Sequence, residues 1–166
     1  MKKRLGFVAI ASLAAGCTTT PPSSTPVPGA ALSEIRYEAG PCFGACPVYG
    51  FSVRADGKGH FDGHRHTQVT GAKDFTVSAG EFATFRDALA PWKPKSGDSL
   101  IQPGNPACGL TATDMPSVEV VWVYSDGSEQ RLSYYFGCDM EKYRALAEAL
   151  SEAPGALPVT DYIDRR

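Results

Sequence analysis

The chain has 166 residues, which is enough for one compact domain with its own hydrophobic core. Hydrophobic residues make up 43% of it and charged residues 20%, a composition that excludes an intrinsically disordered protein. The 16 Lys and Arg residues against 18 Asp and Glu residues lack the positive surplus on which nucleic-acid binding depends, so no nucleic-acid partner is expected.

The first sixteen residues have the pattern of an export signal peptide. Lys2, Lys3 and Arg4 form a positive start, and the apolar run Leu5–Ala15 is too short to span a bilayer of roughly 30 Å. The run ends in Leu-Ala-Ala-Gly before Cys17, which resembles the lipobox of bacterial lipoproteins. The resemblance implies cleavage before Cys17 and acylation of its thiol. An ordinary signal peptide followed by a chance cysteine is the alternative.

Two or three acyl chains at Cys17 would hold the protein permanently at a membrane, because each buried CH₂ contributes about 0.8 kcal/mol. Thr18 is not acidic, and by the same resemblance this favours the outer membrane, with the domain facing the periplasm. Loss of residues 1–16 removes three of the 16 basic residues and leaves 13 against 18 acidic ones, a formal charge of -5.

Residues 17–32 are predicted to form a tether between the lipidated Cys17 and the domain. This segment is rich in Pro, Thr and Ser and has no apolar period. Pro-rich linkers favour an extended conformation of about 3.1 Å per residue, which would hold the domain clear of the lipid. A single domain is then predicted over residues 33–166.

Four short strands are predicted in the first half of the domain. Their apolar residues are mostly β-branched or aromatic, and Gly, Pro and Asp occur between them. Asp56-Gly57 lies between the second and third and favours a tight type I′ hairpin turn. The predicted strands are Ile35–Glu38, Val48–Ala55, Gly59–Gly63 and Asp74–Val77.

A helix is predicted directly after these strands. Ser78 and Glu81 have the spacing of a capping box, in which each side chain accepts a hydrogen bond from the other's backbone N–H. Phe82, Phe85 and Leu89 then lie on one helical face, and Pro91 opposes continuation of the helix.

The second half begins with a long connection, Lys93–Met115, whose length makes it a candidate functional loop. Val118–Tyr124 would place apolar residues on both faces of a strand, so it is predicted to be a central strand covered on two faces. Asp126-Gly127 should turn it into a strand over Glu129–Phe136. Asp139 can then cap a second helix with an apolar stripe, which consists of Met140, Tyr143, Leu146 and Leu150.

These elements predict an α+β fold, an antiparallel sheet with two helices packed on one face. Hairpins with an Asp-Gly turn, each followed by a capped helix, occur twice, so a weak ββα duplication is one interpretation of the pattern. The aromatic residues of the second hairpin are interpreted as core and sheet packing rather than a carbohydrate platform; they are Trp122, Tyr124, Tyr134 and Tyr135.

The densest motif is Cys-Phe-Gly-Ala-Cys-Pro-Val-Tyr at residues 42–49. Together with the strand after it, the Asp-Gly turn, Phe61-Asp62-Gly63 and the Phe- and Leu-containing helix, it resembles the domain-of-unknown-function family DUF6438. The resemblance covers about residues 35–90. The family occurs in bacterial, often exported, proteins and has no established activity, so the resemblance assigns no catalytic residue.

Cys42 and Cys46 lie four apart across Gly44, so a turn can bring their Cα atoms within disulfide distance. In an oxidising compartment a structural bridge is the expected fate of such a pair, and Cys108–Cys138 would follow by subtraction, although sequence alone leaves three pairings open. Thiol exchange is the alternative, but thioredoxin-like chemistry uses a spacing one residue shorter at a helix N-terminus. Phe43 is expected to fill the core beneath this turn, and Phe43 and Tyr49 are candidate binding residues.

The three histidines are close together in the sequence. In an extended strand His60, Asp62, His64 and His66 would share a face, which is a conceivable zinc or copper site. Gly63, which is expected to bend the strand, and the positive charge of Arg65 oppose a metal. A solvated polar face is the plainer interpretation.

No nucleophile elbow, His-Glu-x-x-His motif or phosphate-binding loop occurs in the sequence. We therefore expect a lipid-anchored, disulfide-braced envelope domain without a cofactor, which binds an envelope protein or cell-wall component or serves structurally. The alternative is a periplasmic thiol-redox or metal-binding protein that uses Cys42 and Cys46 or the three histidines.

Overall fold

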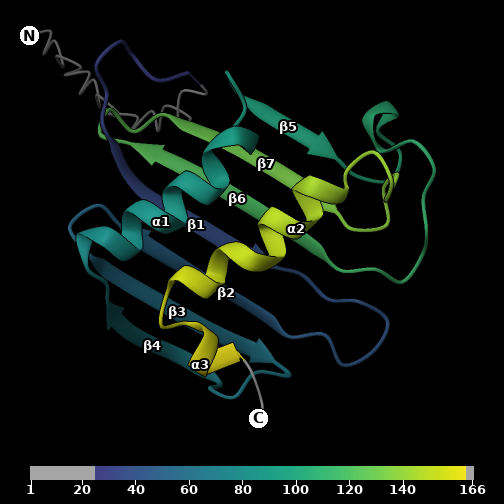
Figure 1. Cartoon of the computed structure of the whole chain (residues 1–166), viewed down its shortest axis with the longest axis horizontal. Helices are drawn as coiled ribbons and strands as arrows, with labels where there is room; N and C mark the ends of the chain where they lie inside the picture. Colours follow the sequence, from purple (N-terminus) through teal and green to yellow (C-terminus); the bar gives the residue numbers. More distant parts are fainter. Residues whose placement is uncertain (1–24, 164–166) are drawn as a thin grey trace, which may run out of the picture.

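Seven strands form one sheet, in the order β4-β3-β2-β1-β6-β7-β5, in the computed structural model, which describes residues 25–163 (Figure 1). Neighbouring strands are antiparallel except β5 and β7, which are parallel. The sheet is therefore mixed, and the predicted antiparallel arrangement is wrong for this one pair. The strands are β1 Leu32–Ala39, β2 Val48–Arg54, β3 Lys58–Arg65, β4 Gly71–Thr76, β5 Asp98–Ile101, β6 Ser117–Tyr124 and β7 Glu129–Tyr135.

The helices lie over one face of the sheet (Figure 1). The Tyr37 hydroxyl on β1 donates to the Leu150 carbonyl of α2 at 2.8 Å, and the Phe51 ring on β2 lies 5.6 Å from the Phe85 ring of α1. The predicted α+β class is confirmed at this level. The α-helices are α1 Ala79–Leu89, α2 Arg144–Glu152 and α3 Thr160–Ile163, and three short 3₁₀ helices are η1 Ala90–Trp92, η2 Pro106–Cys108 and η3 Ala153–Ala156.

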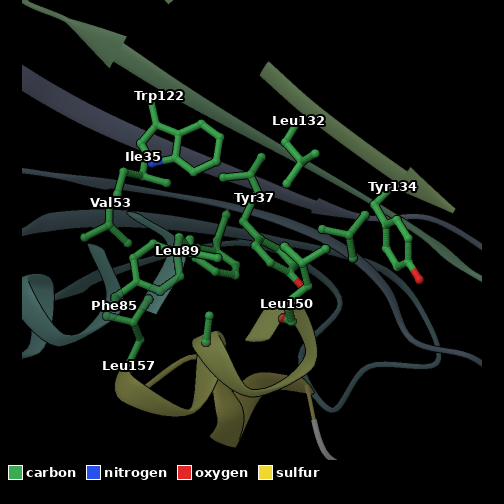
Figure 2. Packing of buried hydrophobic residues seen from close by; sticks show 14 of the residues in the cluster. Ile35, Tyr37, Val53, Phe85, Leu89, Trp122, Leu132, Tyr134, Leu150 and Leu157 are labelled. Carbon is green, nitrogen blue, oxygen red and sulfur yellow. Dashed lines mark hydrogen bonds between the residues drawn. The ribbon is translucent and has the colours of Figure 1, made fainter. Parts of the chain in front are cut away.

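The core lies between the sheet and these helices (Figure 2). Alternate residues of the strands face it, as the period of two requires, and aromatic rings dominate. The rings of Tyr37 and Phe51 stack at 5.0 Å, and Trp122 of β6 is 1% exposed. The interpretation of the second hairpin's aromatic residues as packing is confirmed for Trp122, Tyr124 and Tyr134, which are all buried.

Local sequence signals position α1 and the hairpins correctly. The Ser78 hydroxyl accepts from the Glu81 N–H at 3.2 Å, and the Glu81 carboxylate accepts from the Ser78 N–H at 2.7 Å. The helix ends at Leu89, before Pro91. Both Asp-Gly turns form, with Gly57 and Gly127 at φ of 84° and 80°. The capping box and the two hairpins are therefore confirmed, but the predicted type I′ geometry is wrong. Neither Asp56 nor Asp126 has a positive φ, and the N–H groups of Gly57 and Gly127 donate to the carbonyls of Arg54 and Tyr124, so the central residues of each turn precede its Gly.

The segment Lys93–Met115 is more structured than predicted. It contains β5 and η2, and β5 forms an edge of the sheet beside β7. Four residues are too few to show a period, which is why the sequence pattern misses this strand.

The second helix begins later than predicted. Asp139 lies a turn before Arg144, the first residue of α2, and its carboxylate accepts from the Lys142 N–H at 3.1 Å. Asp139 thus caps the preceding turn and not the helix itself. Leu146 and Leu150 are buried as the stripe predicts, whereas Met140 is 55% exposed.

The central strand β6 is covered differently on its two faces. The helices cover one face, and Val121 on the other face lies in register between Arg36 of β1 and Arg131 of β7. Arg36 pairs with Glu129 at 3.0 Å and Arg131 with Glu119 at 2.6 Å. Val121 is nevertheless only 5% exposed, so long side chains cover it in place of a second layer of elements.

The predicted signal peptide, Cys17 and the tether up to residue 24 lie outside the described residues. The last part of the predicted tether is hydrogen-bonded to the second hairpin. The Val27 N–H donates to the Asp126 carboxylate at 2.8 Å, and the Ala31 N–H donates to the Ser125 hydroxyl at 3.1 Å. Within residues 25–163 no helix is both long and apolar enough to cross a bilayer.

Candidate functional site

Three hollows follow one another beside α2, and we call them together the α2 groove. The outer, central and inner hollows have volumes of about 390, 420 and 260 Å³. Met140 lines the outer and central hollows, and Phe136 lines the central and inner ones. The shared residues show that each hollow adjoins the next, and we describe the row of three hollows as one groove.

The orientation of α2 produces one wall of the groove. Leu146 and Leu150 point into the core, while Arg144, Ala147 and Ser151 line the hollows at helical spacing. The opposite wall comes from the ends of strands such as β7 and β2 and from the loops at this end of the sheet. These loops are joined to each other, since the Phe43 N–H donates to the Asp114 carbonyl at 3.2 Å.

Exposed apolar side chains gather at this end of the molecule. Leu110 and Met140 line the outer hollow and are 85% and 55% exposed, and Phe43, joined to the loop before Met115, is 87% exposed. Single exposed apolar residues are ordinary, but two that line the same hollow, as Leu110 and Met140 do, are typical of an interaction surface. The side-chain composition therefore favours binding of an apolar partner here.

Tyr134 lines the central hollow and carries an unusual hydroxyl. Its side chain is buried, and the oxygen has no hydrogen-bond partner among the described residues. Figure 2 shows this oxygen pointing away from the labelled core residues. Burial raises the pKa of Tyr134, and the nearby Tyr143 and Asp139 raise it further. The hydroxyl is therefore a protonated donor at neutral pH.

Charged groups surround the same hollow. Arg144 is exposed and makes no ion pair within 4.0 Å with any described residue, and Glu141 and Glu148 lie beside it. A cation between two anions, above an apolar interior that contains Met115 and Met140, can hold a ligand of mixed character.

Two disulfides lie in the loops beside the groove, one in the loop between β1 and β2 and one joining the loop before β6 to the segment after β7. Cys108 and Cys138 are bonded with Cα atoms 4.6 Å apart, and both are almost fully buried. Cys42 and Cys46 are bonded with Cα atoms 5.7 Å apart and are half-buried, and Cys46 lines the inner hollow. The expected pairing is thus the one in the structure.

The two predicted binding residues differ in position. Tyr49 is buried and lines the inner hollow, with its ring 6.2 Å from that of Tyr37. Burial raises the pKa of Tyr37 strongly, and Tyr49 adds to the shift. Phe43 does not fill the core, contrary to expectation. Because β2 begins only at Val48, the Cys42–Cys46 turn lies beyond the end of the sheet.

The histidines are not brought together. His60 and His64 lie four residues apart on β3, which is about 13 Å in a strand, and Gly63 between them lies within the strand. The His60 ring contacts the Asp74 carboxylate at 2.6 Å, and His66 follows the end of the strand. Within residues 25–163 no group of three or more His, Cys, Asp or Glu residues could hold a metal ion.

A further hollow of about 250 Å³ lies on the sheet face opposite the helices, between β1 and β3. Because Gly50 has no side chain, the space above its Cα is open, and the Glu38 carboxylate occupies the place that a Cβ would take. Burial raises the pKa of Glu38, against the opposing effect of His64. The described residues that line this hollow are mostly charged or polar, and none of them is an exposed apolar residue like Leu110 or Met140 of the α2 groove.

Sequence analysis predicts the burial of Tyr134 but not its role in the groove. Nothing in the pattern shows that its hydroxyl lacks a partner, because that depends on which groups α2 and the loops bring near it. Arg144 and Met115 likewise gain their positions only through the tertiary fold.

Comparison with curated proteins finds no match. Residues 33–154 match a protein family described as Domain of unknown function (DUF6438). The matched range extends well beyond the residues 35–90 predicted from the cysteine motif. It includes α1, α2 and all seven strands apart from Leu32, the first residue of β1. The match therefore covers nearly all of the sheet and every described lining residue of the groove except Ile163, and the chain belongs to the DUF6438 family.

Proposed function

We propose that this protein is a non-catalytic, lipid-anchored envelope domain that binds a partner polypeptide in the α2 groove. The observation that carries the proposal is the row of three adjoining hollows beside α2, with Leu110 and Met140 exposed at its outer end. A groove of this kind, with flexible Met side chains, suits an extended segment of another chain.

The envelope location is supported by the sequence before the domain and by the cysteines. All four cysteines of residues 25–163 are bonded in pairs, as expected of a protein outside the reducing cytoplasm. Cys17 is then the cysteine left for acylation, with the periplasmic face of the outer membrane as the site of attachment.

The anchor is tested by Cys17→Ser in the full-length protein. Labelled palmitate should be incorporated by the native chain and not by the variant, and the variant should move from the membrane fraction to the soluble periplasmic fraction. Native protein that carries no label and is found in the cytosol would contradict the proposed location.

The groove is tested by selection of peptides from a displayed library against the full-length protein. Enriched peptides should lose binding to Met140→Asp and keep it for Leu100→Asp. Both residues are exposed, at 55% and 43%, so neither change should affect folding, but only Met140 lines the groove. If the peptides bind both variants equally well, they bind outside the groove, and the proposal is contradicted.

Thiol exchange is a second candidate function, favoured by the partial exposure of Cys42 and Cys46 and by the position of Cys46 at the inner hollow. A partner thiolate would attack one of the two sulfurs and release the other as a thiolate. Reaction with glutathione, followed by mass spectrometry of the mixed disulfide, tests it. The positions of His60, His64 and His66 do not favour the metal-binding alternative.

A further inference from the structure

We propose that the end of the domain opposite the tether is the docking surface, and that it binds a partner segment in which a Lys or Arg lies beside an apolar side chain. This inference rests on the proposed function and specifies where the groove faces and which chemistry its partner has. It combines the course of the strands, the exposed apolar side chains of the outer hollow and the charges around them.

The tether enters the domain at one end of the sheet, which we call the near end. The Val27 N–H donates to the Asp126 carboxylate at 2.8 Å, and the Ser125 N–H donates to the Ala31 carbonyl at 2.8 Å. These bonds hold residues 27–31 against the turn between β6 and β7. A lipid at Cys17, eight residues before the first described residue, is therefore joined to the domain at the near end.

The outer hollow lies at the opposite end of the sheet, which we call the far end. β1 begins at Leu32 beside the near end and reaches Ala39 after eight residues, which span about 26 Å in a strand. β7 runs in the same direction as β1, because each is antiparallel to β6, and it ends at Tyr135. The outer hollow is lined by Gly137 and Met140, which follow the end of β7 (Figure 1). The groove therefore opens away from the point of membrane attachment.

The outer hollow offers two exposed apolar side chains to a partner. Leu110 and Met140 line it and are 85% and 55% exposed. The Asp139 N–H donates to the Leu110 carbonyl at 2.7 Å, and the Cys108–Cys138 disulfide joins the two segments that carry the apolar pair. A backbone that is already ordered loses little conformational entropy when a partner binds. The apolar pair is thus held ready for contact.

The charges of the outer hollow distinguish a polypeptide from a lipid as its occupant. Asp139 and Glu141 line it, and none of its described lining residues is basic. Neither carboxylate makes an ion pair within 4.0 Å with any described residue. Two such carboxylates beside exposed apolar side chains oppose contact with anionic lipids and attract a Lys or Arg side chain.

Two cations lie near these carboxylates but outside the outer hollow. The Lys142 amine lies 4.7 Å from the centroid of the Tyr143 ring, and Arg144 lines the central hollow together with Glu148. A basic side chain on a partner therefore meets opposite charge at the outer hollow, while a neighbouring Leu or Ile side chain contacts the apolar pair. An acidic segment would be repelled from the same place.

The orientation is measured with the full-length lipoprotein in phosphatidylcholine vesicles that carry an acceptor dye on a lipid headgroup. The donor dye is attached to an unnatural amino acid in place of Phe43 or Lys58, so that no cysteine is added. Phe43 is 87% exposed at the far end, and the Lys58 side chain is 76% exposed at the near end, after the turn between β2 and β3. Energy transfer should be at least twofold more efficient from position 58. Equal transfer, or more efficient transfer from position 43, would overturn the proposed orientation.

The partner's chemistry is measured with two blocked hexapeptides, one that alternates Leu with Lys and one that alternates Leu with Glu. The Leu-Lys peptide should bind the full-length protein at least tenfold more tightly than the Leu-Glu peptide. Glu141→Lys should reduce this ratio at least fivefold, and Glu152→Lys should leave it unchanged. Glu152 is exposed on α2 and undergoes the same change of charge, but it lines none of the three hollows. Thermal unfolding of each variant confirms that the fold is intact.

The outcomes separate this inference from the proposed function. Equal binding of the two hexapeptides, with library peptides that still depend on Met140, would overturn the basic partner and leave the proposed function standing. Absence of any peptide binding that Met140→Asp abolishes would overturn both. Two other occupants are checked with Leu110→Ser. Binding of the Cys17→Ser protein to phosphatidylglycerol vesicles, or a dimer in sedimentation, would contradict a polypeptide partner if Leu110→Ser abolishes it.

Discussion

The Tyr134 hydroxyl is buried without a hydrogen-bond partner among the described residues, and this affects the stability of the domain. The ring fills the core between β7 and α2, and its edge packs against Phe136 at 5.1 Å and Tyr143 at 5.9 Å. The oxygen contributes nothing to this packing and has no hydrogen-bond partner among the described residues. A phenylalanine would make the same ring contacts without burying an unpaired polar atom.

Tyr134→Phe should therefore leave the free energy of unfolding unchanged or raise it by about 1 kcal/mol. Tyr124→Phe is the matched control, because the Tyr124 hydroxyl donates to Gln130 at 2.5 Å and accepts from Lys93 at 2.8 Å. That change should lower the free energy of unfolding by about 1–2 kcal/mol. Urea denaturation of the two variants measures both, and destabilisation by Tyr134→Phe would show that its hydroxyl has a partner.

Asp126 makes the stability dependent on pH. Hydrogen bonds from the Ser128 hydroxyl, the Val27 N–H and the Ser128 N–H lower the pKa of Asp126 to about 2, from the usual 3.8. A lowered pKa in the folded state stabilises the fold above pH 3.8, and this contribution is lost as the pH falls toward 2.

Asp126→Asn should lower the melting temperature at pH 5 to 7 and have no such effect once the native Asp126 is protonated. The variant should accordingly show a shallower fall of melting temperature between about pH 4 and pH 2 than the native protein does. Parallel curves over this interval would exclude Asp126 as the source of the acid sensitivity.

At the scale of elements, a helix or strand can be predicted from the sequence when the residues that define it lie close together in the chain. The helix α1 is predictable because Ser78 and Glu81 cap it from within four residues, and the hairpins because Asp-Gly turns are local. The strand β5 is not, since it has four residues and its pairing partner β7 begins at Glu129. The start of α2 is displaced because Asp139 caps a separate turn, which adjacent sequence does not distinguish from a helix cap.

The two disulfides should differ in accessibility and in effect on stability. Cys42–Cys46 closes a short ring and is half-buried, whereas Cys108–Cys138 closes a ring of 31 residues and is buried. On the loop-entropy estimate their removal costs about 2 and about 3.7 kcal/mol.

Mild reductant should therefore open Cys42–Cys46 first, as detected by alkylation and peptide mapping. The paired substitution Cys108→Ser with Cys138→Ser should lower the melting temperature more than Cys42→Ser with Cys46→Ser. Simultaneous reduction of both bonds would contradict the difference in burial.

At the scale of the whole molecule, β1 joins two halves of the sheet. It pairs with β2 on one side and with β6 on the other, so that Ile35 and Tyr37 contact elements from both halves of the chain. The α2 groove is likewise assembled from loops and a helix distant in sequence. Patterns in the sequence predict the class of the fold and favour the observed cysteine pairs among three possible pairings, but they do not predict this convergence.

A chain that ends after Met115 should fail to fold, although it contains β1 to β5, α1 and the cysteine turn. It lacks β6, and with it the buried Val120 and Trp122 that complete the core beside β1. Poor dispersion of amide signals in NMR spectra is the expected result, and native-like dispersion would show that the first half is an independent unit.

The central position of β1 also has a consequence for synthesis. A chain that emerges from its amino end delivers residues 32–39 early, yet their second partner, residues 117–124, is still to come. Until then a strand with one apolar face has a free edge, which is the kind of surface that draws other nascent chains into aggregates. Chaperones that shield such edges should therefore determine how much of this protein reaches its folded state.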